Sequence, residues 1–189
     1  MPDIRDQKLL YHLTALDNIE SILQSGLLPR ATLDRFADVA NPEIIENRAA
    51  YGLDRFVPFH WFARNPFDGR VQQDYPNKKF VLITVRRAVA QGRNWSVVPR
   101  HPLANGAPEL LDYQSGIAAI DWETMNRRDY HEAECKSICM AECLSPQPVP
   151  ATEFFRIYAP DEEIARQVSN TINRLQLRLE VEVNSAMFL

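Results

Sequence analysis

Long hydrophobic runs are missing from this chain of 189 residues. No apolar stretch approaches the ~20 residues that a membrane-spanning helix needs. The first eight residues are polar and mixed in charge, unlike the start of a secretory signal peptide. We therefore expect a cytoplasmic protein with no membrane segment.

Cysteine is scarce: the chain has three, and all lie between residues 135 and 143. An odd number in a tight cluster does not make a disulfide framework. The spacing of Cys135, Cys139 and Cys143 suits one face of a helix, which His131 would extend. Structural zinc sites usually contain C-x2-C pairs, which are absent here. We expect buried thiols beside a functional strand and no metal site.

Three common functional motifs are also absent. The chain has no G-x-G-x-x-G sequence after a strand and no Walker-type phosphate loop. It lacks the G-x-S-x-G elbow of α/β-hydrolases as well. If this protein binds a nucleotide, it uses another fold.

Positive charge is not in excess, because the formal net charge is -4. Proteins that bind nucleic acids without specificity usually carry a basic surface. A nucleic-acid substrate would therefore require a local basic patch. The candidate residues, most of which we expect to be solvated surface charges, are Arg64, Arg70, Arg86, Arg87, Arg93, Arg100, Arg127 and Arg128.

What is present fits one α+β domain over residues 1–189, with 46% hydrophobic and 24% charged residues. The patterning predicts a mostly antiparallel mixed sheet surrounded by helices. Expected strands are 8–14, 56–62, 80–85, 139–144, 154–158 and 177–183. Expected helices are one capped by Asp17 and ending near Gly26, one over 44–51, a short one within 108–122, and one capped by Asp161. We expect a loop over 91–107; residues 64–69 end the strand before them, and residues 123–137 are polar and mixed in charge.

Three polar residues stand out in apolar surroundings. Glu142 lies in an otherwise apolar predicted strand, where an unpaired carboxylate would cost several kcal/mol. His12 lies in another apolar strand, and residue type and position alone favour a core histidine with a satisfied hydrogen bond. Asn18 follows that strand, near a helix start where asparagine is common. Glu142 is the strongest of the three candidates.

A resemblance to a known family covers nearly the whole chain. The matching segments, in order, are Tyr11-His12-Leu13-Thr14, Leu16-Asp17-Asn18-Ile19, Val57-Pro58-Phe59, Phe62-Ala63-Arg64-Asn65-Pro66, Ile120-Asp121-Trp122, Met140-Ala141-Glu142-Cys143-Leu144 and Val149-Pro150. With this order and spacing, the sequence resembles the DarT family of DNA ADP-ribosyltransferase toxins. It departs from the family at residues 63–66, where members often have Pro-Arg-Ser-Pro.

The resemblance implies a fold, a reaction and a partner. The fold is that of the ADP-ribosyltransferases, a split mixed β-sheet with NAD+ in the cleft. The reaction transfers ADP-ribose from NAD+ to a base in single-stranded DNA and releases nicotinamide. The partner is an antitoxin of the ADP-ribosyl hydrolase type, which removes the mark.

The resemblance also assigns roles to residues. Glu142 matches the catalytic glutamate, which stabilises an oxocarbenium-like cation or takes a proton from the attacking base. His12, Thr14 and Asn18 would bind NAD+ through its ribose, amide or phosphate groups. Two aromatic residues, which would either stack on nicotinamide or pack in the core, are Tyr11 and Phe59.

Arginines are harder to assign. We choose Arg48 as a catalytic residue that holds an NAD+ phosphate or polarises the acceptor base, against the alternative of an exposed helix arginine. Arg55 is the next candidate, and Arg64 is placed to meet DNA phosphate. Residues 122–137 stand where such enzymes carry a substrate-recognition loop. The side chains there that suit single-stranded bases are Arg127, Arg128, Tyr130 and His131.

Other functions remain open at this point. The same fold also occurs in enzymes that modify RNA or protein and in enzymes that remove a 2′-phosphate from RNA with NAD+. A catalytically inactive NAD-binding module is a further alternative. The simplest alternative is an α+β domain in which Glu142 is salt-bridged and His12 is part of the core.

Overall fold

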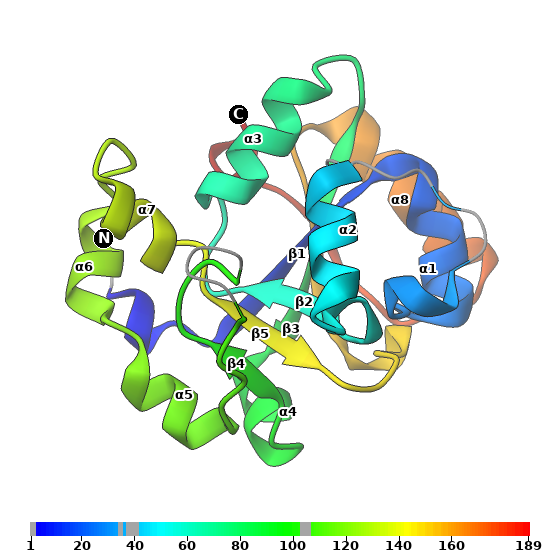
Figure 1. Ribbon diagram of the computed structural model, residues 1–189. Helices are drawn as coiled ribbons and strands as arrows, with labels where there is room; N and C mark the ends of the chain where they lie inside the picture. Colours follow the sequence, from blue (N-terminus) through cyan, green and yellow to red (C-terminus); the bar gives the residue numbers. More distant parts are fainter. Residues whose placement is uncertain (1–2, 34–35, 37–41, 103–106) are drawn as a thin grey trace.

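The computed structural model describes residues 3–33, 36, 42–102 and 107–189, which form one β-sheet with helices packed around it (Figure 1). The strands are β1 (Leu9–Ala15), β2 (Val57–His60), β3 (Phe80–Arg86), β4 (Ser96–Val98), β5 (Glu142–Ser145), β6 (Phe154–Ala159) and β7 (Val181–Val183). The helices are α1 (Ile19–Ser25), α2 (Pro42–Ala50), α3 (Pro66–Asp74), α4 (Arg87–Gly92), α5 (Tyr113–Ala119), α6 (Trp122–Arg127), α7 (Ala133–Ile138) and α8 (Glu162–Arg174). The expected α+β class is confirmed.

The sheet is mixed and is divided near its middle. Its strand order is β4-β5-β2-β1-β3-β6-β7, and every pair is antiparallel except β6 with β7. β1 and β3 are in register over seven pairs, from Leu9–Arg86 to Ala15–Phe80. β1 and β2 share only one pair, Tyr11 with His60. The two halves of the sheet therefore separate beyond this pair, which gives the split sheet that the sequence predicts.

Local chemistry explains the elements that were predicted well. β3 is a continuous apolar run, and its residues from Phe80 to Val85 are all buried, as expected for a strand covered on both faces. Asp161 caps α8 by accepting a hydrogen bond from the Ile164 N–H, at 2.9 Å. Gly26 ends α1 at a φ of 83°, in the left-handed region where glycine is favoured.

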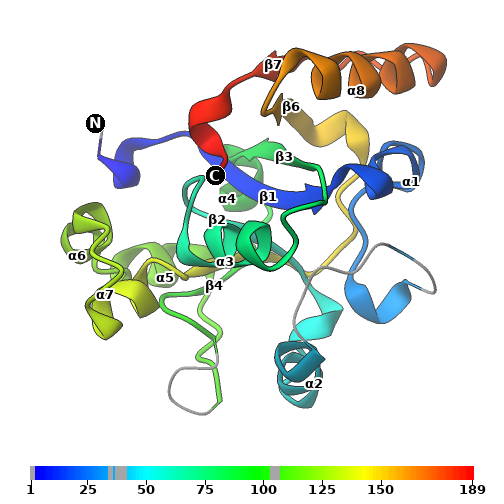
Figure 2. The same ribbon diagram turned by 90° about the horizontal axis from the view of Figure 1, so that it is seen from above.

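The helices form two groups, as seen from above in Figure 2. α1 and α8 pack together beside the β6–β7 side of the sheet. α5, α6 and α7 gather on the other side, where α5 contacts β4. The largest wholly buried side chains are Trp61 and Trp95.

Several sequence predictions were wrong at element boundaries. Asp17 does not cap α1, because it lies inside a 3₁₀ turn over Leu16–Asn18, and the helix starts after Asn18. The strand near Glu142 starts at that residue, three positions later than expected from Cys139. The predicted strand over 177–183 is reduced to Val181–Val183, and Val183 is exposed. Its alternating apolar residues before 181 pack against the core without pairing in the sheet.

Regular structure occurs in three segments where the sequence analysis expected none or made no prediction. α3 begins inside 64–69, because Asn65 caps it and Pro66 occupies the first turn. The segment 91–107 contains β4, and the segment 123–137 contains most of α6 and most of α7. Of these predictions, residues 103–106 lie outside the described residues, as does Asn41 before α2.

The three cysteines are buried and free, as expected, but they do not share one helix. Cys135 lies in α7, Cys139 follows its end, and Cys143 lies in β5. Burial raises the pKa of the Cys139 thiol to about 12, so this thiol is protonated at neutral pH. Among the described residues, no three or more His, Cys, Asp or Glu side chains are grouped to hold a metal ion.

No helix in the described part of the chain combines the length and the apolar character needed to cross a bilayer.

Candidate active site

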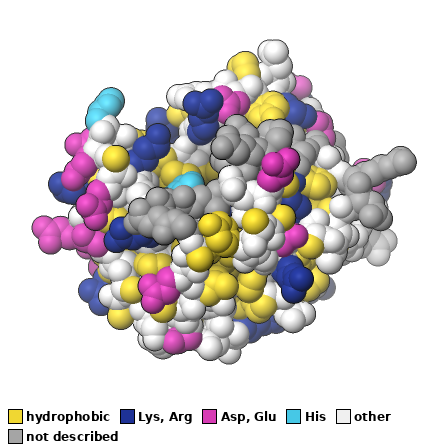
Figure 3. Space-filling view, in the orientation of Figure 1, with side chains coloured by type: hydrophobic (Ala, Val, Ile, Leu, Met, Phe, Trp, Pro, Cys, Tyr) yellow, Lys and Arg dark blue, Asp and Glu magenta, His cyan; other side chains and the backbone are white. Residues whose placement is uncertain are grey.

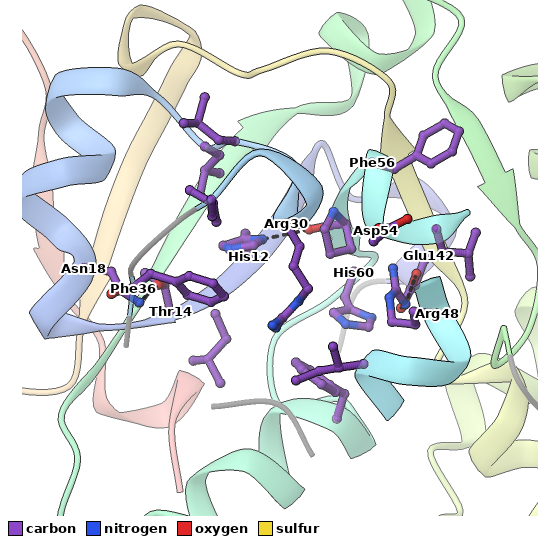
Figure 4. A pocket seen from close by; sticks show the side chains of 18 of the residues that line it. His12, Thr14, Asn18, Arg30, Phe36, Arg48, Asp54, Phe56, His60 and Glu142 are labelled. Atoms are coloured by element: carbon purple, nitrogen blue, oxygen red, sulfur yellow. Dashed lines mark hydrogen bonds and ion pairs between the residues drawn. The ribbon is translucent and has the colours of Figure 1, made fainter. Parts of the chain in front are cut away.

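The split of the sheet opens into a cavity of about 310 Å³. Its wall brings together strands, helices and loops that are far apart in the sequence (Figure 4). Five residues selected from the sequence line it: His12, Thr14, Asn18, Arg48 and Glu142. The structure thus places these polar candidates around one hollow.

An ion pair stands at one end of the cavity. Arg48 of α2 donates from Nη1 to both carboxylate oxygens of Glu142, at 2.8 and 2.9 Å. The two side chains are only 15% and 8% exposed. Because a buried carboxylate needs a partner, this contact explains how Glu142 is tolerated in a strand that is otherwise apolar. The Nη2 of Arg48 is buried and has no hydrogen-bond partner among the described residues.

His12 bridges the split between β1 and β2. Its Nδ1 lies 2.8 Å from the carbonyl oxygen of Pro58. A carbonyl oxygen only accepts, so Nδ1 carries the hydrogen. Burial lowers the pKa of His12 below its usual value, which keeps the ring neutral at pH 7. Its Nε2 is therefore an acceptor, suited to a hydroxyl donor such as a ribose OH.

Thr14 and Asn18 mark the other end of the cavity (Figure 4). The Asn18 side-chain amide donates to the Thr14 hydroxyl oxygen at 3.4 Å. Asn18 precedes α1 but makes no capping hydrogen bond with its side chain. Its amide is therefore turned toward the cavity wall instead of the helix.

Arg30 lies between these two ends, in the middle of the view in Figure 4. Its guanidinium carbon is 4.9 Å from the centre of the Phe36 ring. The rest of the lining is largely apolar and includes Ile22, Leu27, Leu28, Leu53, Phe56 and Phe67. The cavity can thus receive an elongated ligand with flat rings and an anionic centre.

His60 is a cavity residue that the sequence analysis missed. It pairs with Glu142 across β2 and β5, and its ring stacks on Phe67 with centroids 5.4 Å apart. Burial lowers its pKa to about 4, against the opposing effect of the Glu142 charge. His60 is therefore a neutral polar group beside the carboxylate.

The structure does not bring Tyr11 and Phe59 into this cavity. Side chains alternate between the two faces of a strand, so Tyr11 lies on the face opposite to His12, where it packs with Leu13. Phe59 is completely buried in the main core and stacks on Trp95, with ring centroids 5.3 Å apart. Packing thus accounts for both aromatics. The alternation that brings His60 and Pro58 to the cavity was the signal that would have selected them.

The other arginines lie elsewhere. Arg55 is exposed and, unlike Arg48, does not line the cavity. Arg64 and Arg128 line a second hollow, beside α3 and α7, together with Tyr130.

Residues 11–189 match the family model described as "DarT: ssDNA thymidine ADP-ribosyltransferase, DarT". This chain belongs to the DarT family. The match spans the segments in which the sequence resembles that family, from the opening strand to the Glu142 block.

Relatives with known structures share the fold. Thermus sp. 2.9 DarT in complex with ADP-ribosylated ssDNA superposes with a TM-score of 0.81, at 18% identity, over 96% of each chain. The same protein in complex with NAD+ gives a TM-score of 0.77, at 17% identity, over 97% of this chain and 98% of that one. These likenesses confirm the DarT ADP-ribosyltransferase fold.

A longer relative contains a second activity. The "DNA ADP-ribosyl transferase-DNA ADP-ribosyl glycohydrolase fusion protein" of Thermosipho africanus (strain H17ap60334) is 26% identical in an alignment 188 residues long. The alignment covers 87% of this chain. The match spans 45% of that relative. The present chain therefore corresponds to less than half the length of the fusion protein.

Proposed function

We propose that this protein transfers ADP-ribose from NAD+ to a thymidine base in single-stranded DNA, through one domain formed by residues 1–189. The observation that carries this proposal is Glu142: a carboxylate in an apolar strand, held by Arg48 at the end of a deep cavity. Membership of the DarT family supports the choice of thymidine, because the family is described by that substrate.

NAD+ fits the cavity as the donor substrate. Its two nucleosides are joined by a pyrophosphate, and the cavity has polar groups at both ends with Arg30 between them. We assign Arg30 to the pyrophosphate. His12 accepts a hydrogen bond from a ribose hydroxyl through Nε2, and Thr14 and Asn18 hydrogen-bond the end of NAD+ nearest to them. The apolar lining receives the flat rings.

Glu142 and Arg48 then act on the reacting centre. Nicotinamide leaves with the electron pair of its bond to the ribose carbon, and a cation develops on the ribose. The Glu142 carboxylate stabilises this charge electrostatically. The thymine ring nitrogen that carries a hydrogen forms the new bond to the ribose carbon and gives up its proton, for which Glu142 is the nearest base. The buried Nη2 of Arg48 donates to a thymine carbonyl oxygen, which favours loss of that proton.

The name of the fused relative suggests a partner that reverses the reaction. Its name joins a DNA ADP-ribosyl transferase to a DNA ADP-ribosyl glycohydrolase. We propose that this chain is a toxin, that it acts in the cytoplasm, and that a separate or attached glycohydrolase is its antitoxin.

The test is a comparison of the wild type with Glu142→Gln, a substitution that keeps the shape and removes the charge. With NAD+ and single-stranded DNA, the wild type should release nicotinamide and label the DNA. Glu142→Gln should lose at least about 10²–10³-fold in rate, while NAD+ still raises the melting temperature of the variant. Labelling of RNA or protein alone would change the acceptor. NAD+ binding without turnover by the wild type would show an inactive module.

A further inference from the structure

A carboxyl group is buried in the first turn of α3, next to the wall of the catalytic cavity. Asp68 is 1% exposed, and it lines neither the cavity nor the second hollow. The residue before it, Phe67, does line the cavity. Neither carboxyl oxygen of Asp68 has a hydrogen-bond partner among the described residues. Because a buried, unpaired carboxylate is costly, the charge of Asp68 must matter to this turn.

The turn itself is held by one buried asparagine. Asn65 is completely buried, and its side-chain oxygen accepts from the N–H groups of Phe67 and Asp68, each at 3.0 Å. Its side-chain nitrogen donates to the carbonyl oxygen of Phe62 at 3.2 Å. Asn65 and Asp68 have the spacing of a capping box, in which the acidic side chain would bind the N–H of the capping residue. Here that second bond is not made.

The residue before this cap has a strained backbone. Arg64 has a φ of 59°, a value that costs a non-glycine residue on the order of 1–3 kcal/mol. The Tyr130 hydroxyl donates to the carbonyl oxygen of Arg64 at 3.0 Å. The start of α3 therefore stores strain, and an added unfavourable charge can shift it.

Protonation decides how well Asp68 suits this environment. Burial raises its pKa from 3.8 to about 7, against smaller opposing effects of Asn65 and of the Arg64 backbone. The stability that the fold gains from this proton is full below pH 3.8 and is lost by about pH 7. Above about pH 7 the carboxylate is ionised inside the folded protein.

The groups that face Asp68 do not neutralise this charge. Tyr130, from the α6–α7 connection, is the facing titratable group, and burial raises its pKa to about 12. It is therefore neutral over the range in which Asp68 ionises. Further groups that act on Tyr130 are Arg128, Cys135 and Cys139.

Another aspartate of the same helix shows the contrast. Charged side chains of both signs reach the surface over α3 (Figure 3). Asp74, in the last turn, has a side chain that is 40% exposed and pairs with Arg70 at 2.7 Å. Solvent stabilises the charge of such a group. Asp74 thus offers the same chemistry as Asp68 without the burial.

Phe67 connects the turn to the reacting centre. Its ring stacks on that of His60, with centroids 5.4 Å apart, and His60 pairs with Glu142 across β2 and β5. Its backbone N–H is one of the two that Asn65 binds. A shift of the first turn of α3 therefore moves this aromatic wall relative to the catalytic carboxylate.

We propose that Asp68 is a positioning residue of the transfer reaction, which keeps the Phe67 wall in place while its carboxyl group is neutral and loosens it when ionised. This inference rests on the proposed function, since it takes ADP-ribose transfer as the reaction that the wall supports. Asp68 itself touches neither substrate. It acts through the first turn of α3.

The test compares the wild type with Asp68→Asn, which keeps the shape of the neutral carboxyl group and cannot ionise. The matched control is Asp74→Asn, the same substitution at the exposed position. Transfer to a single-stranded oligonucleotide is measured at saturating NAD+ from about pH 6 to about pH 8, on either side of the pKa of Asp68. Hydrogen exchange of the α3 amides is recorded over the same range, with each rate corrected for the intrinsic rate at that pH.

We expect the ratio of wild-type kcat to that of Asp68→Asn to fall at least about 3-fold over this range. Its midpoint should lie near the pKa of Asp68, about 7. The ratio cancels the ionisation of groups that both proteins share, such as Glu142 and the acceptor base. Exchange protection of the Phe67 and Asp68 amides should fall with rising pH in the wild type and in Asp74→Asn, and should stay constant in Asp68→Asn.

A kcat ratio that does not change with pH would overturn the proposal. An equal change in the ratio of Asp74→Asn to Asp68→Asn is expected, and its absence would overturn the proposal as well. Failure of the two proposals is distinguishable. A pH-dependent loss of protection that Asp68→Asn abolishes, with no DNA labelled by any protein, would support the action of Asp68 on α3 and reject the transferase. Labelling with a constant ratio would do the reverse.

Discussion

Glu142 is held by an arginine whose second terminal nitrogen has no hydrogen-bond partner among the described residues. Burying a donor without a partner costs about 1–3 kcal/mol. Such a cost is typical of sites where a ligand completes the hydrogen bonds. We therefore propose two roles for Arg48: Nη1 positions the carboxylate of Glu142, and Nη2 donates a hydrogen bond to the acceptor base.

Replacement of Arg48 by lysine separates the ion pair with Glu142 from the proposed hydrogen bond to the acceptor base. In Arg48→Lys, the ammonium can still pair with Glu142, but it has no second nitrogen in a fixed plane to donate elsewhere. We expect kcat for DNA transfer to fall at least about 10-fold, with little change in the NAD+-induced thermal shift. The measurement is steady-state transfer to an oligonucleotide at saturating NAD+. A wild-type kcat would rule out a role for Nη2.

His60 makes a prediction about pH and stability. Its pKa is lowered to about 4 in the folded protein by burial, from a usual value of 6.5. Between pH 6.5 and 4 the unfolded chain takes up a proton that the folded protein does not, so acid stabilises the unfolded state. This residue alone should lower the free energy of unfolding by about 3 kcal/mol over that interval. Above pH 6.5 its contribution should be constant.

Chemical denaturation at several pH values tests the predicted effect of His60 on the free energy of unfolding. His60→Gln should flatten the loss of stability between pH 6.5 and 4 relative to the wild type, whatever its effect at pH 7. Parallel curves for the wild type and His60→Gln would show that folding does not lower the pKa of His60.

At the scale of elements, the cavity exists because two strands pair only briefly. β1 and β2 share the single pair Tyr11–His60, and the His12 side chain then takes the carbonyl of Pro58. A side chain thus occupies the place of a ladder hydrogen bond. The strands were predictable from their apolar patterns, but this loss of pairing was not. It is a tertiary effect, because β1 pairs along its length with β3 and β2 pairs with β5.

A second element-level feature is the close contact of Gly26 with the chain before β6. A Cβ at this position would lie 2.6 Å from the carbonyl oxygen of Val149, and the φ is positive at 83°. Gly26→Ala should therefore destabilise the protein by about 2 kcal/mol or more. Gly69→Ala is the control, because it lies in α3 with no atom within 4 Å of the new Cβ. It should be neutral or stabilising by up to about 1 kcal/mol. Thermal melts with equal values for the two variants would contradict this account.

The polar part of the site was the part most open to prediction. Glu142 and His12 are conspicuous because a titratable group in an apolar strand needs a partner or a use, and both line the cavity. Phe59 was selected although its neighbour His60 is the residue that lines the cavity, because the strand was predicted but its two faces were not distinguished. α3 was missed although Asn65 and Pro66 are a typical helix start. The boundaries near Asp17 and 177–183 were set by packing that the sequence alone does not show.

At the scale of the molecule, the chain combines a divided sheet with a deep cavity at the division. Its family membership rests on residues 11–189, and its length is less than half that of a relative that also carries a glycohydrolase. We propose that the cavity holds the donor NAD+ and brings the acceptor base to the same carboxylate. We propose that NAD+ and the acceptor base meet at Glu142.

The most direct measurement is the intact mass of an oligonucleotide with one thymidine after incubation with the protein and NAD+. A matched oligonucleotide carries deoxycytidine at that position. The account predicts a gain of one ADP-ribosyl group on the thymidine oligonucleotide only, equal in amount to the nicotinamide released, and no gain with Glu142→Gln. The absence of any gain while NAD+ is bound, or an equal gain with Glu142→Gln, would contradict it.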